Sequence, residues 1–129
     1  MSEETKSVVA IIEDEKFLSN LLKFRLEREG FLVQQLFDGI EALAWLKSNR
    51  PNLILLDLIM PKASGFEVLE QMSLDPQVSG VPIIVLSNLG QDSDVAKVKQ
   101  FGASEFYVKA RVSTEEVVNR VKQLLQGGA

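Results

Sequence analysis

The sequence predicts an α/β fold, a five-stranded doubly wound parallel sheet, from three observations. Short apolar runs alternate five times with longer segments in which apolar residues recur at helical spacing. One run, Leu53–Leu56, is apolar throughout, as is typical of a central strand that helices cover on both faces. Polar side chains directly follow several of the runs. This alternation favours parallel strands joined by right-handed crossovers.

The first two strand–helix units contain one buried and one edge-type strand. A β-branched apolar run at residues 8–12 predicts a buried strand, and the helical leucine stripe that follows it ends at Gly30. Residues 31–37 alternate less cleanly and include two glutamines, which favours a strand near the sheet edge. A short helix over residues 40–46 is expected to end before Pro51, because proline breaks helices. Its Trp45 lies off the apolar stripe and is expected to be exposed.

The last three units begin with the central strand. The elements predicted after it are a helix around residues 66–72, a strand at 81–86, a helix at 91–101, a strand at 105–108 and a final helix after Ser113. Gly102 is placed to end the fourth helix, and Ser113 with Glu116 forms the pattern of a capping box.

Length and composition indicate one domain over residues 1–129. A chain of 129 residues with 46% hydrophobic residues can bury a core of its own, and it shows no repeat, linker or low-complexity tract. The polar start and the glycine-rich end, residues 1–7 and 127–129, are expected to fray.

Charge and residue usage exclude several classes of function. The formal net charge of -4 argues against direct binding of nucleic acid, because phosphate contacts need a basic face. Without cysteine or histidine there are no disulfides, no imidazole catalysis and no usual zinc site. No signal peptide and no apolar run of about eighteen residues is found, so we expect a cytoplasmic protein without membrane insertion.

The residues that follow the predicted strands form a candidate site. They are Glu13 and Asp14 after the first strand, Asp57 after the third, Ser87 after the fourth and Lys109 after the fifth. In a parallel sheet these positions share one edge, where ligands bind. Packed carboxylates repel one another unless a cation offsets the charge, and oxygen ligands suit Mg²⁺ or Mn²⁺. An ammonium and a hydroxyl nearby can bind phosphoryl oxygens, and a carboxylate can act as the nucleophile.

These residues lie in motifs that resemble a known family. The motifs are Ile12-Glu13-Asp14-Glu15, Leu56-Asp57-Leu58-Ile59-Met60-Pro61, Leu86-Ser87-Asn88 and Val108-Lys109. In this order, the motifs make the chain similar to the receiver domain of two-component response regulators, in the stand-alone form of chemotaxis regulators. The resemblance covers essentially the whole chain. It implies the flavodoxin-like (βα)5 fold with strand order 2-1-3-4-5.

The resemblance also implies a role for each residue. Asp57 would accept a phosphoryl group from a histidine kinase or histidine phosphotransfer protein. Asp14, Asp57 and the backbone carbonyl of Ile59 would ligate Mg²⁺, with Mn²⁺ as the alternative, and Glu13 would act through a bound water.

The remaining roles belong to the response that follows transfer. Lys109 would contact the phosphoryl group, Ser87 would swing its hydroxyl onto it, and Phe106 would turn inward. The face of the fourth helix, fifth strand and fifth helix would then change its affinity for a partner that the sequence does not name, as a monomer or a phosphorylation-dependent dimer. Such a protein is no ordinary enzyme, although it promotes its own phosphoryl transfer and slow dephosphorylation.

The chain departs from the family pattern near the site. Ala110 stands where the family usually has proline after the lysine, and we expect the Lys109–Ala110 peptide to be cis nonetheless, as in the family. Asn88 replaces a small residue. Ile59 and Leu89 replace polar residues that influence the attacking water, which predicts slow dephosphorylation.

Two other classes of function remain open. One is a phosphorylation-independent interaction module on the same fold. The other is an aspartate-nucleophile phosphohydrolase or a nucleotide binder. The second class is disfavoured because the loop after the first strand is acidic rather than glycine-rich, and the chain has no Gly-Lys-Ser/Thr motif. With the chain ending at the fifth helix, we expect a switch without a separate output domain.

Overall fold

The computed structural model describes residues 6–89 and 91–126 and has the predicted doubly wound architecture. The strands are β1 (Val8–Ile12), β2 (Leu32–Leu36), β3 (Leu53–Leu56), β4 (Ile83–Ser87) and β5 (Glu105–Val108). The helices are α1 (Lys16–Arg28), α2 (Gly39–Leu46), α3 (Gly65–Leu74), α4 (Asp92–Gln100) and α5 (Thr114–Gln126), with a 3-10 turn at Lys109–Arg111. All strand pairs are parallel, in the order β2-β1-β3-β4-β5, which confirms the predicted strand order.

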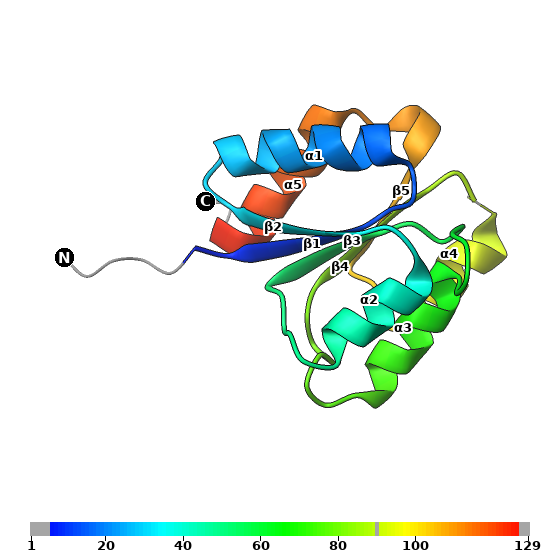
Figure 1. Cartoon of the computed structure of the whole chain (residues 1–129). Coiled ribbons are helices and arrows are strands. Elements are labelled where there is room, and N and C mark those ends of the chain that lie inside the picture. The colour runs from blue at the N-terminus through cyan, green and yellow to red at the C-terminus, as the bar shows by residue number, and fades with distance from the viewer. Residues whose placement is uncertain (1–5, 90, 127–129) are drawn as a thin grey trace.

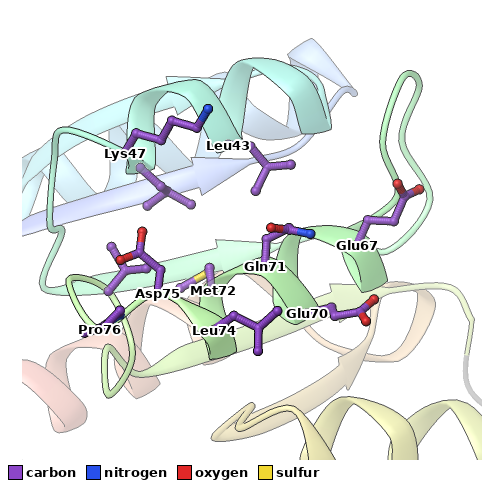
Figure 2. A pocket seen from close by; sticks show the side chains of 11 residues that line it. Leu43, Lys47, Glu67, Glu70, Gln71, Met72, Leu74, Asp75 and Pro76 are labelled. Atoms are coloured by element: carbon purple, nitrogen blue, oxygen red, sulfur yellow. The ribbon is translucent and has the colours of Figure 1, made fainter.

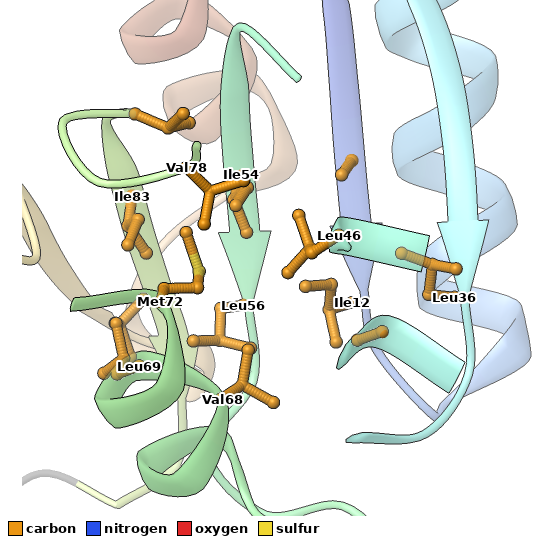
Figure 3. Packing of buried hydrophobic residues seen from close by; sticks show 14 of the residues in the cluster. Ile12, Leu36, Leu46, Ile54, Leu56, Val68, Leu69, Met72, Val78 and Ile83 are labelled. Atoms are coloured by element: carbon orange, nitrogen blue, oxygen red, sulfur yellow. The ribbon is translucent and has the colours of Figure 1, made fainter. Parts of the chain in front are cut away.

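Two helical layers cover the sheet. Helices α1 and α5 pack on one face, and α2, α3 and α4 pack on the other (Figure 1). Side chains of the central strand β3 pack alternately against the two layers. Leu53 and Leu55 face α1 and α5, while Ile54 and Leu56 face α2, α3 and α4 (Figure 3). All four side chains are at most 2% exposed, which explains why this strand is apolar throughout.

The register of the sheet fixes which strand ends are neighbours. Ile12 of β1 pairs with Leu56 of β3, so Glu13 and Asp57 leave adjacent strands at the same level. The strand order reverses between β1 and β3, and crevices at such points bind ligands in open α/β sheets. On the other side of β3, Ser87 of β4 pairs with Val108 of β5, which places Lys109 at the same edge.

The predicted helix ends are largely confirmed. Gly30 and Gly102 follow α1 and α4 with φ of 96° and 97°, a left-handed conformation that glycine adopts without strain. At the start of α5, the Glu116 N–H donates to Ser113 Oγ and the Ser113 N–H donates to Glu116 Oε1, both at 3.0 Å, as the capping box predicted.

Three details complete or correct the predicted elements. Trp45 was expected to be exposed, but it is half-buried against the core beneath α2 and α3, because that core is broader than the apolar stripe of α2 alone indicates. Strand β4 begins at Ile83 and includes Ser87. Of the ends predicted to fray, residues 1–5 and 127–129 lie outside the described residues.

A close contact holds helix α3 against the end of the central strand. A Cβ atom on Gly65 would overlap the backbone of Asp57 and Leu58, so only glycine fits at the start of α3. The Gly65 N–H donates to the Leu58 carbonyl at 2.9 Å. The packing of α3 therefore fixes the backbone that carries Asp57.

No helix within the described ranges is long and apolar enough to cross a membrane.

Candidate phosphoryl-acceptor site

Three predicted carboxylates meet at the carboxyl edge of the sheet. Oxygen atoms of Glu13, Asp14 and Asp57 lie within 4.8 Å of one another. Glu13 and Asp57 are 3% and 5% exposed, whereas Asp14 lies in the solvent-exposed loop after β1. Buried carboxylates this close repel one another, so a positive charge is needed among them.

Lys109 supplies that charge. Its ammonium lies 3.0 Å from Asp57 Oδ2, 2.8 Å from Glu13 Oε1 and 2.6 Å from Glu15 Oε2. The 3-10 turn that begins at Lys109 directs its side chain back across the end of the sheet, where it is only 10% exposed. The structure thus brings together the predicted residues Glu13, Asp14, Asp57 and Lys109.

Burial and neighbouring charges have opposite effects on the pKa of Glu13, and likewise on the pKa of Lys109. Burial raises the pKa of the Glu13 carboxyl to about 7, because desolvation outweighs the opposing effect of the Lys109 ammonium. Burial by itself would lower the pKa of Lys109, but its hydrogen bonds to Glu13, Glu15 and Asp57 more than offset this and raise it. Lys109 is therefore charged at neutral pH, while Glu13 is poised between its two protonation states.

Of the other predicted residues, Ile59 contacts this group through its backbone N–H, whereas the contacts described for Ser87 and Phe106 lie outside it. The Ile59 N–H donates to Asp57 Oδ1 at 3.3 Å, and the Ile59 side chain points outward, with the residue 56% exposed. Ser87 is fully buried, and its Oγ accepts a hydrogen bond from the Leu89 N–H at 3.4 Å. Phe106 lies on β5, half-buried against the core beneath α2, α3 and α4.

The expectation of a cis Lys109–Ala110 peptide is wrong, because the described residues contain no cis peptide bond. A cis bond before a residue other than proline costs about 2.5 to 4 kcal/mol, and here the lysine reaches the carboxylates without it. The Ala110 N–H, a donor that proline lacks, instead donates to Asn88 Oδ1 at 3.1 Å. Two of the departures from the family pattern, Asn88 and Ala110, are therefore in direct contact.

The donor set fits a hard divalent cation. Every candidate ligand is an oxygen, two of the carboxylates are buried, and one ammonium faces several negative charges. Mg²⁺ and Mn²⁺ prefer such ligands and leave positions for water or a phosphoryl oxygen. The arrangement can thus hold a cation beside a carboxylate nucleophile and an ammonium.

A large groove lies elsewhere. It encloses about 520 Å³ between α2 and α3, and Figure 2 shows Leu43 and Lys47 on one side of it and Glu67, Glu70 and Gln71 on the other. None of the residues that line this groove belongs to the carboxylate cluster. The groove therefore takes no part in the chemistry at Asp57.

Sequence reasoning missed one participant. Glu15 is the third of the acids after β1, and its contact with Lys109 joins residues 94 positions apart, so it has no local signal in the sequence. The one hint in the sequence that Glu15 belongs to the site is that it continues the row of acids Glu13-Asp14-Glu15. A third carboxylate beside two others can compete for the same ammonium.

Comparison with known proteins agrees with this geometry. The family model for the response regulator receiver domain matches residues 9–122. The PhoB phosphate regulon transcriptional regulatory protein of Rhizobium meliloti is 37% identical over 118 residues, which cover 92% of this chain and 52% of that protein. The chain thus spans about half the length of this curated relative.

Solved structures share the fold. The phosphorylated cyanobacterial phytochrome response regulator RcpA superposes with a TM-score of 0.86 at 26% identity, over 97% of each chain. The Mn²⁺-bound form of the response regulator Rcp1 superposes with a TM-score of 0.81 at 30% identity, over 91% of this chain and 92% of that one. With the family match over most of its length, this chain belongs to the receiver domains of two-component response regulators.

Proposed function

We propose that Asp57 accepts a phosphoryl group from a phosphohistidine donor and that the protein thereby switches its affinity for a partner. The carrying observation is the 3.0 Å contact between the Asp57 carboxylate and the Lys109 ammonium beside the buried oxygen ligands. In the transfer, an Asp57 oxygen bonds to phosphorus while the bond from phosphorus to the donor's imidazole nitrogen breaks. The donor would be a histidine kinase or a histidine phosphotransfer protein.

The proposal includes a Mg²⁺ ion, with Mn²⁺ as the alternative. The carboxylates of Asp14 and Asp57 and the backbone carbonyl of Ile59 would hold it, and Glu13 would act through a bound water. When bound, the ion would neutralise charge on the phosphoryl oxygens. The oxygen-only donor set supports this assignment, as does the Mn²⁺-bound relative.

The output would start at Ser87 and Lys109. The Ser87 hydroxyl oxygen accepts a hydrogen bond from the Leu89 N–H of its own loop, and it would turn toward a phosphoryl oxygen on Asp57. Phe106, on the neighbouring strand, would then turn inward from its half-buried position. These movements would change the surface of α4, β5 and α5, and with it the affinity for a partner or a second copy of the chain. The net charge of -4 favours a protein partner over nucleic acid.

The raised pKa of Glu13 predicts that Mg²⁺ binding depends on pH. Since the pKa is about 7 without the ion, Glu13 carries a proton below pH 7 that cation binding has to displace. The apparent affinity for Mg²⁺ should fall about tenfold between pH 8 and pH 6, as expected for one group with this pKa. Isothermal titration calorimetry in two buffers of different ionisation enthalpy measures both the affinity and the released proton. An equally steep pH dependence in Glu13→Gln would contradict the assignment.

Receiver domains are signalling modules rather than classical enzymes, and we propose that this one hydrolyses its acyl phosphate slowly. Ile59 is 56% exposed and Leu89 half-buried, and neither side chain can hydrogen-bond an attacking water. The double variant Ile59→Asn, Leu89→Glu should shorten the phosphoryl lifetime about two- to tenfold. The decay of phosphoprotein after removal of the donor measures this. Ile40, also 56% exposed, provides the control Ile40→Asn, and an equal effect of this control would refute the explanation.

The direct test of the proposed function is the mass of the intact protein after incubation with acetyl phosphate and Mg²⁺. A gain of one phosphoryl group that hydroxylamine removes, as it does from acyl phosphates, supports the proposal. No gain under these conditions would favour the phosphorylation-independent interaction module on the same fold.

A further inference from the structure

The Lys109 ammonium has more carboxylate partners than the proposed reaction uses. Glu13 and Asp57 belong to the proposed cation and phosphoryl site, but the shortest contact, 2.6 Å, is to Glu15. Glu15 lies in the loop between β1 and α1, where its N–H donates to Glu13 Oε2 at 3.1 Å. This turn of the loop directs the Glu15 carboxylate toward Lys109.

The carboxylates around Lys109 and an incoming phosphoryl group compete for the N–H groups of its ammonium. A lysine ammonium has three N–H groups, and here it contacts three carboxylate oxygens. A phosphoryl oxygen on Asp57 therefore competes with these carboxylates for the N–H groups of Lys109. Glu13 is held by burial and Asp57 carries the phosphoryl group, whereas the Glu15 side chain is 60% exposed and can move into water at little cost.

We propose that Glu15 is a positioning residue that holds Lys109 in the unphosphorylated state and gives it up to the incoming phosphoryl group. This inference rests on the proposed function of Asp57. Two effects act in the same direction: the Glu15 carboxylate occupies one N–H of Lys109, and its negative charge repels the phosphoryl oxygens. Glu15 would thus slow phosphorylation and make it depend on a donor that can displace the contact.

Kinetics of two Glu15 variants test the inference. Glu15→Gln removes the charge and Glu15→Ala removes the acceptor as well. Both should raise the rate of phosphorylation by acetyl phosphate about two- to fivefold, the size expected for one largely exposed ion pair. The subsequent hydrolysis should change less than about twofold, because Lys109 has already left Glu15 by then. This split between the two steps distinguishes positioning from a general loss of structure, which would affect both.

Glu70→Gln is the matched control. Glu70 is an exposed glutamate on α3 that lines the groove of Figure 2 and takes no part in the ion pairs of the described residues. The variant makes the same change of net charge away from Lys109 and should phosphorylate at the wild-type rate. Equal rates in wild type, Glu15→Gln and Glu15→Ala would overturn the inference.

A second measurement does not depend on phosphorylation. A carbodiimide joins a carboxylate and an amine in contact as an amide, so peptide mass spectrometry should find Glu15 linked to Lys109 in the metal-free wild-type protein. Mg²⁺ with beryllofluoride, a phosphoryl analogue, should reduce this product. A cross-link that is missing at the start, or that persists with the analogue, would overturn the exchange. Failure of the proposed function itself would show as no phosphoryl uptake by the wild type.

Discussion

Replacement of Asp57 by asparagine should abolish phosphoryl uptake. The amide has nearly the shape of the carboxylate, so the packing of the 5% exposed side chain persists, but it lacks the anionic oxygen that attacks phosphorus. It also removes one negative charge from beside Glu13 and Asp14, and Lys109 keeps its contacts with Glu13 and Glu15, so the free energy of unfolding should not fall. Intact-protein mass spectrometry after incubation with acetyl phosphate and Mg²⁺ measures the uptake.

Asp92→Asn is the matched control for this variant. Asp92 is an exposed aspartate in the first turn of α4, lies outside the carboxylate cluster of Glu13, Asp14 and Asp57, and undergoes the same chemical change. It should gain the same mass as the wild-type protein. Uptake of a phosphoryl group by Asp57→Asn, at any residue, would show that Asp57 is not the sole acceptor.

Replacement of Lys109 by methionine should both destabilise the fold and impair transfer. It leaves the buried carboxylates of Glu13 and Asp57 without their ammonium, and breaking a buried ion pair costs about 3 to 5 kcal/mol. Addition of Mg²⁺ should restore more stability to this variant than to the wild type, since the ion then supplies the positive charge that Lys109 no longer provides. Loss of a donor to the phosphoryl oxygens should slow phosphorylation by about a hundredfold. Urea unfolding with and without Mg²⁺ measures the stability.

Lys122→Met is the control that distinguishes the loss of the Lys109 contacts from the loss of any one positive charge. Lys122 forms an ion pair with Glu29 at 2.9 Å, but the two side chains are 37% and 39% exposed. Such a surface pair contributes at most about 1 kcal/mol, so this control should be nearly as stable as the wild type. Comparable losses of stability in the two variants would show that the Lys109 pairs are no stronger than a surface contact.

The sequence predicted the framework of the site because its signals are local. An apolar run such as Leu53–Leu56 can be stable only where both faces are covered, and the residue that ends it must then lie at the sheet edge. Glycine after a helix and a capping box before one depend on neighbouring backbone alone, and Gly30 and Ser113 bear this out. The meeting of Glu13, Asp14, Asp57 and Lys109 followed from the same reasoning.

The contacts between loops were beyond such reasoning. The sequence did not indicate that Glu15 reaches Lys109 or that Asn88 accepts from the Ala110 N–H. Each depends on how far apart the loops after β1, β4 and β5 lie, and this distance is set by the packing of helices on the sheet.

By itself, then, the sequence determined the sheet, the residue types at its carboxyl edge and the buried position of Asp57, because hydrophobic periodicity and helix-end signals act within a few residues. Only the tertiary structure decided which partners Lys109 selects and where the Ser87 hydroxyl points. Those choices are rotamers of side chains from segments far apart in the chain, and their energies depend on distances that exist only once the sheet and both helical layers have packed.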